Sequence, residues 1–273
     1  MAITSWVRIL ASVGMIIFAG AVAAGATGAF FSDTETSTGN TFTAGALDLQ
    51  IDNESFVTNS SGLLEASPST SWILSDPMGL FFNFSGLQPA AMGEDTISIH
   101  VNDSDSWACI AAKITSTTEN NQNESEAAVD VTTGANEGEL QSHLEFAFWA
   151  DDGDNVFENN ETILWTGPAG TLFDGSWQSI ADATGPAFYG NTALTGDSTV
   201  HVAKAWCFGD LGEAAVADDA DTDPVTRGAS GFTCVSDNSE DEAQSDGVQA
   251  NVSFYATQSS NNGSFECSSL PTL

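Results

Sequence analysis

Acidic side chains crowd one short stretch of this chain, "ADDGDNVFENNETI", densely enough to bind a metal ion. The oxygen-bearing side chains within it are Asp151, Asp152, Asp154, Asn155, Glu158 and Glu161. Calcium takes several oxygen ligands and often draws them from one loop, and Phe148, Trp149 and Trp165 flank this loop with apolar anchors. The sequence therefore predicts a calcium site here, with the ligands Asp152, Asp154, Glu158 and Glu161.

A second acidic stretch, "DDADTDP", places Asp219, Asp221 and Asp223 at alternating positions. Neither stretch is an EF-hand, because the first lacks acids at the required offsets and the second has Pro224 where glycine is needed. A protein this acidic also forms solvated acidic loops without any ion. A solvated, salt-adapted loop is therefore the alternative interpretation for both stretches.

The residue patterns of common hydrolases are missing. The three histidines, His100, His143 and His201, lie far apart in strand-like segments, and no HExxH motif could supply zinc ligands. No GxSxG motif marks a serine nucleophile either. We therefore expect a protein that is not an enzyme.

Four cysteines, Cys109, Cys207, Cys234 and Cys267, are spaced too irregularly for a structural zinc site. An even number in an exported chain predicts two disulfides, which could connect in three ways. We favour Cys207–Cys234, which closes a loop of modest size over an Asp-rich stretch and leaves Cys109–Cys267 as the second pair. A disulfide that closes a loop of that size stabilises the fold by about 3 kcal/mol, because it restricts the unfolded chain.

Eight Asn-x-Ser/Thr sequences are present, and an exported protein can carry glycans at such sites. The candidates are Asn53, Asn59, Asn83, Asn123, Asn160 and Asn262, with Asn102 and Asn251 completing the set. A chain rich in Asn, Ser and Thr also produces several of these sequences by chance.

Apolar residues alternate with polar ones in several segments separated by Gly, Asn, Asp, Ser and Pro. The apolar series are Leu47, Leu49, Ile51; Ile97, Ile99, Val101; Leu144, Phe146, Phe148; Val200, Val202; and Val248, Ala250, Val252, Phe254. This period of two is typical of strands with one dry and one wet face. The pattern predicts an all-β fold, an antiparallel β-sandwich, with no internal repeat and no domain linker.

Acidic residues far outnumber basic ones, with 38 Asp and Glu against 4 Lys and Arg. Such a surface repels nucleic acid and anionic membranes, so neither is expected as a partner. Concentrated salt would screen the repulsion between the acids, which indicates a salt-loving source, most simply an archaeon. The 17 Phe and 7 Trp argue for a folded core rather than a disordered acidic chain.

The N-terminus has the layout of a signal peptide. Arg8 precedes the uncharged stretch 9–26, and small residues follow at 27–29. We expect residues 1–29 to form a signal helix that is cleaved, so that the secreted, extracellular protein starts near Phe30 and keeps no membrane segment. The alternative is an uncleaved membrane-spanning helix, for which the stretch is just long enough.

The residues after this stretch form a recognisable series: Phe31-Ser32-Asp33-Thr34-Glu35, Asn40-Thr41-Phe42, Ala44-Gly45 and Leu47-Asp48-Leu49. This series resembles the start of the TasA/camelysin family of exported proteins. Two further stretches, "FSGLQPAAMGEDTISIHVNDSDSWAC" and "VQANVSFYATQ", resemble an inner region and the closing strand of that family. Residues 115–240 are only loosely covered by the resemblance.

The resemblance implies a jelly-roll-like sandwich over residues 43–273, a dedicated signal peptidase, and polymerisation into biofilm-matrix fibres or archaeal pili. Residues 30–42 would act as a donor strand that completes the next subunit's sheet, anchored by Phe30, Phe31 and Phe42. The main partner would be the protein itself, with other matrix or surface proteins as further partners. The alternatives are a monomeric, calcium-stabilised surface-layer or adhesin-like domain and, third, a camelysin-like metallopeptidase, for which the chain offers no zinc motif.

Overall fold

A computed structural model describes the chain in nine ranges, which are 32–36 (backbone only), 49–71, 73–74, 87–102, 104–120, 122–132, 134–219, 222–260 and 262–273. The expected signal peptide and the anchor residues Phe30, Phe31 and Phe42 lie outside these ranges. Ser32–Leu273 forms one compact unit.

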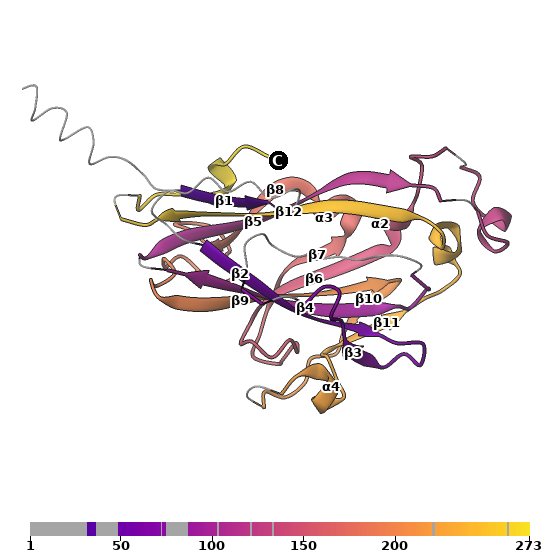
Figure 1. Cartoon of the computed structure of the whole chain (residues 1–273), viewed down its shortest axis with the longest axis horizontal. Coiled ribbons are helices and arrows are strands. Elements are labelled where there is room, and N and C mark those ends of the chain that lie inside the picture. Colours follow the sequence, from indigo (N-terminus) through magenta and orange to yellow (C-terminus); the bar gives the residue numbers. More distant parts are fainter. Residues whose placement is uncertain are drawn as a thin grey trace, which may run out of the picture. The chain divides into compact units, whose positions relative to one another are not determined.

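Two large antiparallel sheets form the sandwich of this unit, as Figure 1 shows. One sheet has four strands in the order β1 (Ser32–Thr36), β12 (Gly247–Gln258), β5 (Ser106–Thr118), β8 (Asp174–Ala181). The other has six, in the order β3 (Leu64–Ala66), β2 (Leu49–Thr58), β4 (Met92–Val101), β9 (Ser198–Phe208), β6 (Leu144–Asp151), β7 (Ile163–Pro168). A separate hairpin pairs β10 (Asp210–Glu213) with β11 (Phe232–Val235). The predicted all-β sandwich is confirmed.

The main core lies between the two sheets and is built from the alternating residues of the sequence. Ile97 and Ile99 of β4, Phe146 of β6 and Phe254 of β12 are each at most 1% exposed and belong to one cluster. Side chains two residues apart share a face of a strand, so the period of two places them all on the inner side. Burying each such side chain contributes about 1.5–3 kcal/mol.

A second core covers the outer face of the six-stranded sheet. Trp149 of β6 and Ala203 and Ala205 of β9 are fully buried there, against Phe157 and Phe232. The expectation of one dry and one wet face is therefore wrong for these strands. The reason is that the β10–β11 hairpin and the loop after β6 fold over that face.

Two disulfides tie peripheral segments to the sheets. Cys207 on β9 bonds Cys234 on β11 and so fixes the hairpin over the second core. Cys109 on β5 bonds Cys267 in the one-turn 3₁₀ helix η3 (Cys267–Ser269), which holds the C-terminal segment against the four-stranded sheet. These are the two pairs that the cysteine spacing favours, and their presence is compatible with an extracellular protein.

Helices contribute little to the described residues. The α-helices there are single turns, namely α2 (Leu140–His143), α3 (Ala169–Leu172) and α4 (Pro224–Arg227). In the ranges that the structure describes, no helix has the length and apolar character needed to cross a membrane.

Candidate functional site: a sheet edge and an acidic loop

The expected donor segment, residues 30–42, is described only at Ser32–Thr36, which forms β1. This strand pairs antiparallel with β12 of its own chain, from Ser32 opposite Thr257 to Thr36 opposite Ser253. On its other side β12 pairs with β5 along its whole length. β1 therefore occupies the edge of the four-stranded sheet, next to the strand whose sequence resembles the closing strand of the family (Figure 1).

The predicted calcium loop follows β6, and Asp151 at the end of that strand organises it. Its carboxylate accepts hydrogen bonds from Trp149 Nε1 (3.1 Å), Thr96 Oγ1 (3.0 Å) and the backbone N–H of Gly153 (3.0 Å). Burial raises the pKa of Asp151 to about 6 despite these bonds. These hydrogen bonds connect the start of the loop to β4 and β6, and so fix where the following acids lie.

The four predicted ligands do not converge on one point. Carboxylate oxygens lie within 4.8 Å of one another in three groups: Asp151–Asp152–Glu161, Asp152–Glu158–Asp218 and Asp154–Glu158–Asp219. No group holds more than two of the four residues predicted to bind calcium. The prediction of one site made by Asp152, Asp154, Glu158 and Glu161 therefore needs correction, because the loop spreads them over neighbouring positions.

An arginine lies in the middle of one of these groups. Arg227 Nη1 is 2.6 Å from Glu158 Oε1, 3.2 Å from Asp219 Oδ1 and 3.7 Å from Asp154 Oδ2. The second terminal nitrogen of the guanidinium, Nη2, donates to the Ala217 carbonyl. The side chains of Asp154 and Glu158 are each 1% exposed, and that of Arg227 is 11% exposed. We call Asp154, Glu158, Asp219 and Arg227 the arginine-centred cluster. The guanidinium supplies the positive charge there.

Local sequence explains how Arg227 reaches this place. Asp223 accepts hydrogen bonds from the backbone N–H groups of Val225 and Thr226 and so caps α4, with Pro224 at its first position. Gly228 ends the helix at φ 71°, a conformation that glycine adopts without strain. Sequence reasoning missed this contact, although D-P-x-x-R-G is a readable signal for a capped turn that presents an arginine.

Asp151, Asp152 and Glu161 lie outside the arginine-centred cluster and form a group of their own. Burial, and then Asp151, Asp152 and Glu158, raise the pKa of Glu161 to about 8, although the carboxylate accepts the backbone N–H of Glu158 at 2.9 Å. Within the arginine-centred cluster, burial raises the pKa of Asp154 to about 7. Calcium binding in this loop stays a prediction for the group Asp151–Asp152–Glu161.

A buried ion pair lies on the inner face of the six-stranded sheet. Lys204 Nζ contacts Asp95 Oδ2 between the paired strands β9 and β4, and both side chains are at most 4% exposed. Ser55 and Asn53 of β2 also donate to Asp95. Burial lowers the pKa of Lys204, and the Asp95 carboxylate opposes that shift.

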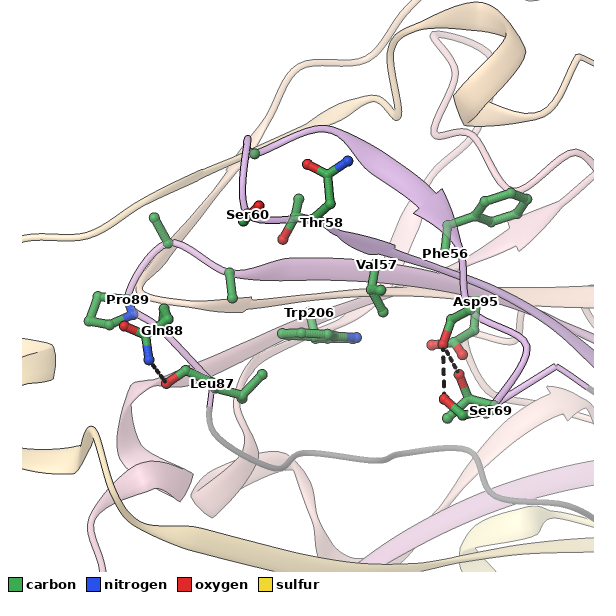
Figure 2. A pocket seen from close by; sticks show the side chains of 16 residues that line it. Phe56, Val57, Thr58, Ser60, Ser69, Leu87, Gln88, Pro89, Asp95 and Trp206 are labelled. Atoms are coloured by element: carbon green, nitrogen blue, oxygen red, sulfur yellow. Dashed lines mark hydrogen bonds between the residues drawn. The ribbon is translucent and has the colours of Figure 1, made fainter.

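A pocket of about 570 Å³ opens beside this ion pair. Figure 2 shows Trp206 across its middle, with Leu87 and Gln88 towards one end and Asp95 at the other. Asp95 is the one ionisable side chain in its described lining. Since that carboxylate is engaged by Lys204, Ser55 and Asn53, the pocket offers a polar wall rather than a free acid.

The glycosylation candidates differ in accessibility. Asn123 and Asn160 are exposed, Asn59 and Asn262 are partly exposed, and Asn83 lies outside the described residues. Asn53 is 2% exposed and donates to the Thr70 carbonyl at 2.7 Å. Asn53 is therefore the least accessible of the described candidates, because its amide is buried and hydrogen-bonded in the folded protein.

No protein-family model matches the chain, and a comparison with curated proteins finds no match. The resemblance to the TasA/camelysin family stays an expectation that rests on the N-terminal series and on the two further stretches of sequence.

Proposed function

We propose that this chain is a secreted structural subunit that polymerises into extracellular filaments, as in a biofilm matrix or an archaeal pilus, by donor-strand exchange. The observation that carries the proposal is the pairing of β1 with β12, on the side of β12 that does not pair with β5. The export signal, the N-terminal series and the two disulfides support the same proposal.

The chemistry of β1 suits exchange between copies. Its sequence, SDTET, is short and polar, so the main-chain hydrogen bonds to β12 supply most of its attraction. A strand of the same sequence from a neighbouring subunit can make the same bonds in the same register. An uncovered edge on a secreted sandwich promotes aggregation, and a neighbour's terminus would convert that edge into an ordered interface.

The test compares a chain that starts at Thr43 with one that starts at Phe30, both prepared in molar salt. We expect the shorter chain to fold with both disulfides, shown by near-UV circular dichroism and intact mass, and to stay monomeric under electron microscopy. A peptide of residues 30–42 should bind the shorter chain and block growth by the longer one, whereas a scrambled peptide should do neither. Filaments of normal length from the shorter chain would overturn donor-strand exchange.

The second candidate is a monomeric, calcium-stabilised surface-layer or adhesin-like domain, which the group Asp151–Asp152–Glu161 favours. Micrographs of the chain that starts at Phe30 separate the two. Filaments support the first function, and dispersed particles at all concentrations support the second.

A further inference from the structure

At one end of the sandwich the chain leaves β5 and returns through α2 (Figure 1). A second group of acids lies close together there. Glu119 directly follows β5, Glu126 begins the 3₁₀ helix η1 (Glu126–Ala128), and Asp246 directly precedes β12. One carboxylate oxygen from each of these three lies within 4.8 Å of the others, and the same holds for Glu119, Asp130 and Glu139. We call Glu119, Glu126, Asp130, Glu139 and Asp246 the five-acid cluster.

Several oxygens in this cluster are buried without a hydrogen-bond partner among the described residues. They are both carboxylate oxygens of Glu119, Oε2 of Glu139 and Oδ1 of Asp246. Asp246 as a whole is 8% exposed and Glu126 is 0% exposed. A buried carboxylate oxygen that lacks a donor is costly, so these atoms point to a positively charged ligand.

The other oxygens of the cluster are fixed by donors. Glu126 accepts from the backbone N–H of Asn123 at 3.0 Å and from Ser245. Asp246 Oδ2 accepts the backbone N–H of Glu139.

Thr132 holds two further members of the cluster. Its N–H donates to Asp130 Oδ1 at 2.8 Å, and its hydroxyl lies 2.8 Å from Glu139 Oε1. Surrounding donors therefore hold Glu126, Asp130, Glu139 and Asp246 in place beside Glu119, whose oxygens are unpartnered.

No described cation neutralises this cluster. Lys204 and Arg227 are engaged elsewhere, and Lys113 donates to the carbonyl of Leu273. Burial, together with Asp246, Glu126, Asp130 and Glu139, raises the pKa of Glu119 to about 7.

We infer that the five-acid cluster binds calcium through Glu119, the residue that its two groups share. Its donors are all hard oxygens, both carboxylate oxygens of Glu119 lack a hydrogen-bond partner among the described residues, and neither group contains a histidine or cysteine that would favour zinc. Magnesium demands near-ideal octahedral geometry and keeps several waters, so a crowded site of this kind suits calcium better. A bound ion would fasten the chain between β5 and α2 to the start of β12.

The test is calcium titration of the full secreted chain in molar KCl, by calorimetry and by thermal unfolding against an EGTA control. The key variant is Glu119→Gln. It removes a carboxylate whose two oxygens accept no hydrogen bond from the described residues. Its matched control is Glu124→Gln, an exposed glutamate in the same segment. We expect Glu119→Gln to weaken calcium binding at least tenfold and to lose most of the calcium-induced rise in melting temperature, while Glu124→Gln behaves as the parent.

Two further measurements keep the result interpretable. Asp246→Asn should lose the same calcium response while melting in EGTA at or above the parent's temperature, because it removes an unbalanced charge. Hydrogen exchange should show calcium protecting residues 122–139 in the parent but not in Glu119→Gln. Equal calcium isotherms for parent and Glu119→Gln, or protection confined to residues 151–161, would overturn the inference.

Discussion

The arginine-centred cluster and the five-acid cluster face the same electrostatic problem and meet it differently. Each collects buried carboxylates at the border of a sheet, where repulsion between them opposes folding. The first contains a guanidinium within 4 Å of three acids, and the second has no cation among the described residues. A fixed internal cation makes one cluster independent of the medium, whereas the other depends on ions from solution.

Removing salt should produce the largest loss of stability. It also tests whether a cluster with its own cation depends less on the ions in solution. The Debye length grows from about 3 Å at 1 M to about 30 Å at 0.01 M, so the exposed acids repel one another strongly once salt is removed. We expect near-UV circular dichroism and the melting temperature to fall steeply from molar KCl downward. A melting temperature that does not respond to salt would show that the exposed acids do not repel as argued.

Replacing the internal cation should produce the next largest effect. Arg227→Gln leaves Asp154 and Glu158 buried without their partner and should cost about 3 kcal/mol of unfolding free energy, measured by urea denaturation. The control is Lys113→Gln, at an exposed cation, which should change stability by less than about 0.5 kcal/mol.

Measuring the stability of Arg227→Gln and the parent at several salt concentrations tests the contrast between the two clusters. Buried pairs are screened little, so parent and Arg227→Gln should lose stability in parallel as salt is removed. Curves that converge in concentrated salt would mean that Arg227 acts as an exposed charge, and the contrast between the clusters would disappear.

A smaller effect should appear in the pH dependence of stability. Glu94 is fully buried, and burial raises its pKa well above 4.5, with the nearby charges of Asp151, Asp95 and Asp154 adding to the shift. The folded state therefore keeps this proton after the unfolded chain has lost it. The stability that the raised pKa contributes is complete below about pH 4.5 and is lost as the pH rises through the folded value.

Glu94→Gln should reduce this dependence by at most about 1.4 kcal/mol per pH unit, the slope for one proton. The measurement is urea denaturation in EGTA between about pH 5 and about pH 8. Glu119→Gln serves as the comparison, since burial and four neighbouring acids raise the pKa of Glu119 to about 7. If Glu94→Gln keeps the parent's slope and Glu119→Gln flattens it, the pH dependence comes from the five-acid cluster instead.

The sequence predicted the sandwich because period-two alternation depends only on neighbouring residues, as the burial of Ile97, Ile99 and Phe254 shows. It did not predict the second core, although the unbroken apolar run around Trp149 is typical of a strand buried on both faces. The convergence of Glu119 with Asp246 could not be predicted, because it depends on the pairing of β5 with β12 across more than a hundred residues of chain. Arg227 illustrates the same limit: its capped turn is readable locally, but its acidic partners are set by tertiary structure.

The pairing of β1 with β12 in one chain makes assembly a competition under the proposed function. A strand tethered to its own binding edge is present there at an effective concentration on the order of millimolar, whatever the concentration of the protein. A neighbour's strand has to displace it, so isolated subunits would stay closed when dilute and join only above a threshold. The end of a growing filament, whose edge has already released its own β1, would accept the next subunit faster than two free subunits could start a new filament.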